Sequence, residues 1–184
     1  MIYDIPSIIK RFDSGEYLEY VFFWGHQSTS SLLTKACLSQ WYPCVFDVDG
    51  ITYNCAEQYM MSEKARLFED NATLAKILAS SDPKIIKAIG REVKNFNVKK
   101  WASESKDIVI KGNMHKFAQN IELKGFLLHT DNKILVEASP YDTIWGIGMK
   151  ESEKGVMNPH NWKGFNKLGF ALMEVRDRLS VKKN

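Results

Sequence analysis

The stretch CVFDVDGITYNCAEQYMMSEKARLF, residues 44–68, decides the fold because a hairpin pattern leads directly into a helix pattern. Two β-prone runs flank Asp49–Gly50, the pair favoured in the type I′ turn of a two-residue hairpin. This predicts a β-hairpin over residues 44–53. The residues after it predict a helix, with Asn54 as its N-cap and Glu57 at the third helical position of a capping box.

Other segments extend this pattern in both directions along the chain. Two further strands are predicted where β-branched and aromatic residues gather, at residues 17–24 and 133–138, and a polar loop at residues 26–31 follows the first of them. Further helices are predicted from their capping residues and apolar periodicity. They run from Asp82–Pro83 to Gly90, over most of residues 106–128 with weak points at Gly112 and Gly125, and after an Asn166 cap through an apolar face of Leu168, Ala171, Leu172, Val175 and Leu179.

The order of these segments indicates the fold class. Strands and helices do not alternate regularly, which excludes a doubly wound parallel sheet and favours a helix-rich α+β fold with a small β-sheet or hairpin. A length of 184 residues suits one domain. We therefore predict a single domain over residues 1–184, with its core at about residues 20–180.

The composition is that of an ordinary globular protein, with 45% hydrophobic and 26% charged residues. The sequence shows neither a signal-peptide pattern nor an apolar run of about 18 residues, so we expect a cytoplasmic protein without a membrane span. Three cysteines without CxxC spacing indicate neither a disulfide framework nor a zinc site. The four histidines lack metal-ligand spacing, and no metal is expected.

Positive charge is concentrated in one part of the chain. The net charge is only +3, but residues 84–124 contain ten lysines and arginines against four acids. This segment is either a solvated surface or a basic wall that attracts phosphate groups.

Four residues of the predicted central helix share one face at i, i+4, i+7 and i+11 spacing: Glu57, Met61, Lys64 and Phe68. Glu57 and Lys64 lie about 10 Å apart along the helix axis, so they can reach opposite ends of one bound small molecule. Alternatively, Glu57 only completes the capping box, and Lys64 is a surface lysine whose stem covers Met61. In the functional interpretation, Lys64 is a nucleophile or a phosphate ligand, and partial burial favours its neutral amine.

Two of the five tryptophans and one arginine fall in unusual surroundings. Trp101 follows a Lys–Lys pair, and Trp145 lies in a loop after the strand predicted at residues 133–138. Aromatic rings among positive charges suit stacking on a base. Arg91, just after a predicted turn at Gly90, can bind phosphate through its guanidinium group.

The loop SPYDTIWGIGM, residues 139–149, contains an acid, a tryptophan and a second glycine that a simple turn does not require. A turn explains one proline and one glycine. We interpret the loop as the rim of a pocket, in which Asp142 faces the reacting group and Trp145 stacks on a ring. Gly146 and Gly148 would then let the backbone approach a ligand closely, where a Cβ atom would collide.

Eight motifs occur in an order that resembles the NADAR (YbiA-like) family, over about residues 21–179. They are FFWG, LSQWYP, YNCAEQYMMSEKA, GR, KF, LLHT, LVEASPYDTIWGIGM and NKLGFALMEVRDRL. The long central motifs are specific, whereas GR or KF alone would mean nothing. The chain departs from the family pattern at one position. The family motif reads LSN, whereas this chain has Gln40 in place of the asparagine, so the amide lies one carbon further from the backbone.

The resemblance implies an α+β, YbiA-like fold with a nucleotide-type pocket. It also implies cleavage of an N-glycosidic bond between ribose and a base, without a metal or redox cofactor. Carried over to this chain, it makes Lys64, Glu57 and Asp142 the expected catalytic residues. The expected substrate-binding residues, from the motifs and from the surroundings described above, are Trp145, Trp101, Arg91, Trp24, Gly25, Tyr42, Gly146 and Gly148.

Two substrate classes are implied by the resemblance. One is ADP-ribose attached to guanine, in DNA or in a free nucleotide, and we place it first. The other is the phosphorylated ribosylamino-pyrimidine intermediates of riboflavin biosynthesis. A module that binds ADP-ribose without turnover and a structural or partner-binding protein remain as alternatives. The enzyme hypothesis predicts that Asp142 and Trp145 face the same cavity as Glu57 and Lys64.

Overall fold

The computed structural model describes residues 3–26 and 32–180 of the 184-residue chain. Residues 27–31 of the predicted polar loop therefore lie outside the described residues. The described part contains seven α-helices, two 3₁₀ helices and two two-stranded sheets. This content confirms the predicted helix-rich α+β class. Over the same residues, no helix is both long and apolar enough to cross a membrane.

Two compact units divide the chain, and we name them by their place in the sequence. The terminal unit combines residues 1–39 with residues 122–184, and the central unit holds residues 40–121. The terminal unit therefore depends on contacts between segments that lie far apart in the sequence. A single domain over the whole chain stays a prediction.

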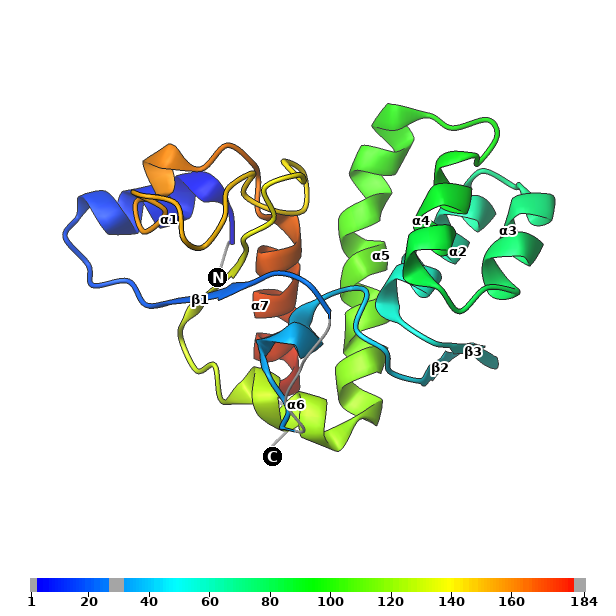
Figure 1. Cartoon of the computed structure of the whole chain (residues 1–184), viewed down its shortest axis with the longest axis horizontal. Coiled ribbons are helices and arrows are strands. Elements are labelled where there is room, and N and C mark those ends of the chain that lie inside the picture. Colours follow the sequence, from blue (N-terminus) through cyan, green and yellow to red (C-terminus); the bar gives the residue numbers. More distant parts are fainter. Residues whose placement is uncertain (1–2, 27–31, 181–184) are drawn as a thin grey trace. The chain divides into compact units, whose positions relative to one another are not determined.

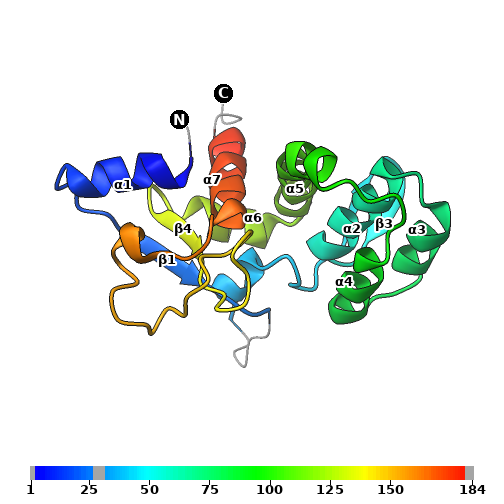
Figure 2. The same ribbon diagram turned by 90° about the horizontal axis from the view of Figure 1, so that it is seen from above.

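A parallel pair of strands joins the two segments of the terminal unit. β1 (Tyr20–Phe23) pairs with β4 (Ile134–Glu137), and Figure 2 shows both beside α7 (Lys167–Ser180). The strands predicted at residues 17–24 and 133–138 are thus confirmed. The first three residues of β4 are fully buried, as expected for a strand covered on both faces. The other elements of this unit are α1 (Ile5–Asp13), η1 (Lys35–Leu38), α6 (Ile121–Leu128) and η2 (Pro159–Asn161).

Helix α7 packs against β4 through the apolar face that the sequence predicts. All five residues of that face are buried, and each buried leucine or valine contributes about 1.5–3 kcal/mol. An added Cβ atom at Gly169 would lie 2.1 Å from the carbonyl oxygen of Leu135, so only glycine allows this approach. Asn166 precedes α7 as predicted, but its side chain does not act as an ordinary cap. It accepts the N–H of Glu137 and donates to the carbonyl of Leu135, each at 2.9 Å, and so ties β4 to the start of the helix.

The central unit begins with the predicted hairpin. β2 (Phe46–Val48) and β3 (Ile51–Tyr53) are antiparallel. Asp49 and Gly50 between them have φ angles of 51° and 80°, as a type I′ turn requires. Four helices follow the hairpin and are labelled in Figure 1: α2 (Ala56–Leu67), α3 (Asn71–Leu78), α4 (Pro83–Arg91) and α5 (Val98–Gln119).

The predicted capping box at the start of α2 is wrong. Cys55 rather than Asn54 is the N-cap, and no side-chain cap bond forms. Instead, Oε1 of Gln58 accepts the backbone N–H of Asn54 at 2.8 Å. The backbone N–H of Glu57 donates to the carbonyl oxygen of Gln40 at 2.9 Å. The carboxyl group of Glu57 is therefore not required for the cap.

Gly112 lies inside α5 and does not interrupt it, contrary to the prediction, whereas α4 ends at Arg91, one residue after Gly90. An added Cβ atom at Gly90 would lie 2.2 Å from Sδ of Met61. At Gly112 it would lie 2.4 Å from Cδ1 of Tyr59. Both glycines thus allow close packing of α4 and α5 on α2, and this packing compensates for their low helix propensity.

Other helix boundaries also differ from the prediction. The segment at residues 106–128 forms the end of α5 and all of α6, with the break at Asn120 rather than at a glycine. α5 begins earlier than predicted because the Asn97 side chain caps it. Helices α1 and α3 were not predicted, although both start at capping aspartates, Asp4 and Asp70.

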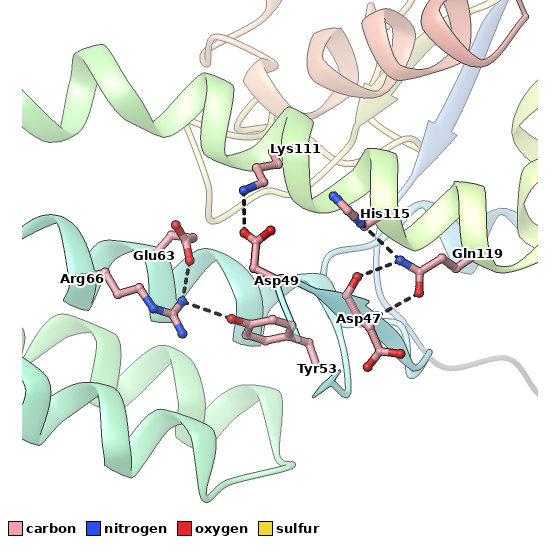
Figure 3. Close-up of polar contacts among 8 residues, drawn as sticks. All are labelled: Asp47, Asp49, Tyr53, Glu63, Arg66, Lys111, His115 and Gln119. Carbon is pink, nitrogen blue, oxygen red and sulfur yellow. Dashed lines mark hydrogen bonds and ion pairs between the residues drawn. The ribbon is translucent and has the colours of Figure 1, made fainter. Parts of the chain in front are cut away.

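Polar contacts fasten the hairpin to the helices that flank it (Figure 3). On the α5 side, Gln119 accepts the backbone N–H of Asp47 at 2.9 Å and donates to its carbonyl at 2.7 Å. On the α2 side, Arg66 donates to the hydroxyl of Tyr53 at 3.0 Å. These bonds fix the hairpin directly before α2, the helix that carries Glu57 and Lys64.

Candidate active site

Lys64 lies on α2, where this helix packs closely on α4. Its Nζ donates a hydrogen bond of 2.7 Å to the carbonyl oxygen of Gly90. The absence of a side chain at Gly90 lets α4 approach α2 at this level. A neutral backbone carbonyl therefore positions the amine through a hydrogen bond, and it is not a base that would remove the proton from the amine.

Aromatic rings surround the Lys64 amine. Its Nζ lies 4.4 Å from the ring centroid of Phe96 and 5.8 Å from that of Trp101. Phe96 contacts Phe68 in turn, edge to face, with centroids 5.3 Å apart. Trp101 is half-buried in the first turn of α5. The amine thus lies between apolar surfaces rather than in open solvent.

These surroundings lower the pKa of Lys64 below the ordinary lysine value. Burial of the amine is the largest cause, and the positive charge of Arg91 lowers the pKa further. The carboxylate of Glu57 acts in the opposite direction. The net lowering increases the fraction of neutral amine at a given pH, and a neutral amine is a nucleophile.

Glu57 is a buried acid, with 5% of its surface exposed. Its backbone is held by the carbonyl oxygen of Gln40, as described above. The side-chain oxygen of Gln40 accepts a hydrogen bond of 2.8 Å from Asn113, which is fully buried on α5. The position that departs from the family pattern thus keeps a polar contact and supports the start of the helix that carries Glu57.

Two further expected binding residues belong to the central unit. Arg91 is exposed at the last position of α4. Tyr42 is half-buried, and its ring centroid lies 5.8 Å from Nζ of Lys116, a fully buried lysine of α5. A cation–π contact within the chain therefore accounts for the position of Tyr42.

In the terminal unit, the loop after β4 folds around Asp142. The Oδ1 atom of Asp142 accepts the backbone N–H groups of Ile144 at 2.9 Å and Trp145 at 2.7 Å, which is the arrangement of an Asx turn. Its backbone carbonyl accepts the N–H of Gly148 at 3.1 Å. Asp142 therefore determines the shape of the loop, in addition to any chemical role.

Contacts and backbone angles within the chain explain why positions 146 and 148 are glycines. An added Cβ atom at Gly146 would lie 2.8 Å from the carbonyl oxygen of Glu137. Gly148 has a φ of 65°, and an added Cβ atom would lie 3.0 Å from Thr143. The loop's own backbone thus requires both glycines, and their close approach to a ligand stays a prediction.

The aromatic residues of the terminal unit are partly accessible. Trp145 is half-buried, and its carbonyl accepts the N–H of Leu168 at the start of α7. Trp24, directly after β1, is 53% exposed and contacts the ring of Tyr141 at 6.0 Å. Gly25 follows with a φ of 79°, so a larger residue there would be strained. Both tryptophans therefore present ring surface outside the buried core.

Trp24 also lines a pocket of about 370 Å³, together with Lys35, Ala138, Lys150, Glu151 and Ser152. Lys35 and Glu151 form an ion pair of 2.6 Å at this pocket. An aromatic ring beside two lysines suits a ligand that combines a ring with a phosphate group.

The expected site residues form two clusters, one in each unit. The central cluster contains Glu57, Lys64, Arg91 and Trp101, with Tyr42 elsewhere in the same unit. The terminal cluster consists of Trp24, Gly25, Asp142, Trp145, Gly146 and Gly148. That both clusters line one cavity remains a prediction.

Sequence reasoning missed four groups that the structure adds to these clusters: the Gly90 carbonyl, Phe96, Lys35 and Lys150. No periodic pattern connects residues on separate elements. Only Phe96 carried a local signal, as an aromatic residue between lysines in KNFNVKK.

Cys55, at the N-cap of α2, is not an activated nucleophile. Burial raises the pKa of its thiol to about 11, so the thiolate is scarce near neutral pH. Among residues 3–26 and 32–180, no group of three or more histidine, cysteine, aspartate or glutamate side chains is arranged to hold a metal ion.

Comparison with known proteins shows similarity along most of the chain. The model of the NADAR domain family matches residues 22–180. An N-glycosidase of Acanthamoeba polyphaga mimivirus is 42% identical over 164 residues, which cover 86% of this chain and 95% of that protein. N-glycosidase YbiA of Escherichia coli is 32% identical over 136 residues, 74% of this chain and 76% of that protein. The NMR structure of E. coli YbiA aligns with a TM-score of 0.72 at 27% identity, over 90% of this chain and 87% of that one.

These similarities confirm the YbiA-like fold predicted from the motifs. The family match runs through both the terminal and the central unit. Relatives named N-glycosidases also support glycosidase activity as the general function. The chain belongs to the NADAR domain family.

Proposed function

We propose that this protein is an N-glycosidase that removes ADP-ribose from guanine, in DNA or in a nucleotide. The observation that carries the proposal is the environment of the Lys64 amine. The Gly90 carbonyl fixes this amine, aromatic rings partly bury it, and its pKa is lowered. It lies on the same helix as the buried acid Glu57. In the displacement of a base from ribose, a fixed amine can serve as the nucleophile and a carboxyl group as the acid.

The first chemical step is attack by neutral Lys64 on the anomeric carbon of the ribose. The new bond forms between Nζ and that carbon while the bond to the base nitrogen breaks, and its electron pair leaves with the base. The carboxyl group of Glu57 gives a proton to the departing base. The carboxylate of Asp142 stabilises positive charge that develops at the anomeric carbon.

The second step returns the enzyme to its starting state. The glycosylated amine gives a proton to Glu57, which passes it to the ring oxygen as the bond between the anomeric carbon and that oxygen opens. This yields a protonated Schiff base between Lys64 and the open sugar. Water adds to the imine carbon and gives a proton to Glu57, and collapse of the adduct releases the ribose as an aldehyde and restores the amine. The net reaction consumes one water and yields the free base and the ribose product.

Basic and aromatic groups support binding of the remainder of the substrate. In the central unit, Arg91 suits a phosphate. In the terminal unit, the lysine-lined pocket at Trp24 suits a phosphate together with a base such as the adenine of an ADP-ribosyl group.

A product assay against three substrates tests the proposal. The protein is incubated with ADP-ribosylated guanosine, ADP-ribosylated DNA and a phosphorylated ribosylamino-pyrimidine, and the products are identified by mass spectrometry. We expect ADP-ribose from the first two. Turnover of the pyrimidine alone would assign the activity to riboflavin intermediates. Binding of ADP-ribose without any product would indicate a binding module and overturn the enzyme proposal.

The dependence of the rate on pH follows from the lowered pKa of Lys64. Protonation removes the nucleophile, so kcat should fall as the pH falls through that pKa, which lies below the ordinary lysine value. Replacing Arg91 by glutamine removes a positive charge that lowers this pKa, so the acid limb of the kcat profile should move to higher pH. An acid limb that does not move in the Arg91→Gln variant would mean that another group controls it.

Substitutions of Asp142 should separate its structural role from its charge. Asp142→Ala removes the acceptor of two backbone N–H groups, and we expect the free energy of unfolding in urea to fall by about 1–3 kcal/mol. Asp142→Asn keeps an oxygen for these bonds, so it should unfold much like the wild type, yet lower kcat by about 10²-fold. Wild-type kcat in Asp142→Asn would restrict Asp142 to shaping the loop.

A further inference from the structure

The segment between α4 and α5, residues 92–97, is held firmly by the chain around it. Val93 is buried, with 5% of its surface exposed. The backbone N–H of Lys94 donates to Oδ2 of Asp70 at 2.9 Å. Asn97 ends the segment as the N-cap of α5. Three consecutive anchors thus fix the backbone on either side of Phe96.

Asp70 is a strong anchor for this segment. It is 7% exposed and also accepts hydrogen bonds from the backbone N–H and the hydroxyl of Thr73, at 3.0 and 2.7 Å. These bonds, led by the one from Lys94, lower the pKa of Asp70 to about 2. The carboxylate therefore stays charged and keeps its bond to the segment at any physiological pH.

Phe96 remains 45% exposed although its backbone is fixed. Its ring is held edge to face by Phe68 and lies 4.4 Å from the Lys64 amine. The preceding residue, Asn95, has a φ of 54°, a left-handed conformation that asparagine adopts more readily than most residues. The chain thus leaves apolar surface exposed beside Lys64, and packing of the core does not require this.

We infer that Phe96 forms a stacking subsite for the planar base of the substrate. The inference deepens the proposed function and rests on it, because the ring that would hold the base also contacts the Lys64 amine. Arg91, Lys94 and Lys99 are exposed on the same stretch of chain and suit the phosphate carried by the sugar. Exposed aromatic surface among such charges fits a nucleotide better than an apolar protein surface.

Binding of two probes tests the subsite without relying on turnover. Guanosine 5′-monophosphate contains a base, a ribose and a phosphate, whereas ribose 5-phosphate lacks the base. Calorimetry should show that the wild-type protein binds the first about tenfold more tightly. Phe96→Leu should lose this preference, and Phe96→Tyr should keep it. The matched control is Val98→Ala, which truncates another exposed apolar side chain two residues away and should also keep the preference.

The outcomes separate the subsite from the glycosidase itself. An equal preference in the wild type and in Phe96→Leu, or no preference in the wild type, would overturn the subsite. If cleavage still depends on Lys64 in that case, the proposed function stands without it. If the Phe96-dependent preference is present but no N-glycoside is cleaved, the subsite stands and the glycosidase proposal fails.

Discussion

Replacing Lys64 by methionine is expected to lower the rate of N-glycoside cleavage by about 10³-fold or more, because the variant has no amine to attack the anomeric carbon. Replacing it by arginine should be equally damaging. Arginine keeps the positive charge but is not deprotonated in proteins. The rate is measured as kcat with ADP-ribosylated guanosine at saturating substrate.

The arginine variant distinguishes a nucleophile from a charge. If Lys64 only stabilises phosphate or a developing negative charge, Lys64→Arg should retain most of the activity, and the covalent mechanism would be excluded. Lys76→Met is a suitable control, because Lys76 is an exposed lysine of α3 that no argument places at the site. Both Lys64 variants should melt within about 4 °C of the wild type, since the lost contacts are few.

Replacing Glu57 by glutamine should lower kcat by about 10²–10⁴-fold, because the isosteric amide cannot give a proton to the departing base. The same change removes a carboxylate that raises the pKa of Lys64, so the acid limb of the kcat profile should move to lower pH. At low pH, the loss of the acid lowers kcat, whereas the lowered pKa of Lys64 raises it. They therefore separate proton transfer from a simple charge effect on the lysine.

A higher rate in Glu57→Gln at low pH would contradict the role of Glu57 as an acid. It would show that Glu57 acts only by keeping Lys64 protonated. The matched control is Glu63→Gln on the same helix. Glu63 pairs with Arg66, as Figure 3 shows, and its loss should change kcat by less than about threefold.

The local elements of the fold could be predicted because their signals are local. Asp49–Gly50 has the positive φ angles that its residue types favour, and the hairpin follows from them. The apolar face of α7 repeats at helical spacing, and burial of that face against β4 is the direct consequence.

Other features depend on contacts between elements, and no local pattern encodes them. Gly90 was expected to end a helix and Gly112 to weaken one, but both glycines are required by close packing on Met61 and Tyr59 of α2. Asparagine is a favoured N-cap residue, but the side chain of Asn166 forms its hydrogen bonds with β4. Tertiary packing outweighs local preference in each case.

The candidate site shows the same division. Glu57 and Lys64 could be placed together because they share one helix and one face. The Gly90 carbonyl and Phe96 could not, since they reach Lys64 from α4 and from the segment after it. Likewise, the sequence indicated Asp142 as a site residue but not the two backbone bonds that make it the centre of its loop.

The most direct test of the account is to trap the covalent intermediate that it requires. The protein is incubated with ADP-ribosylated guanosine in the presence of sodium borohydride, digested and analysed by mass spectrometry. The account predicts a reduced adduct between the sugar and the peptide that contains Lys64, together with loss of activity. Continued turnover without any adduct, or an adduct on a different lysine, would contradict it.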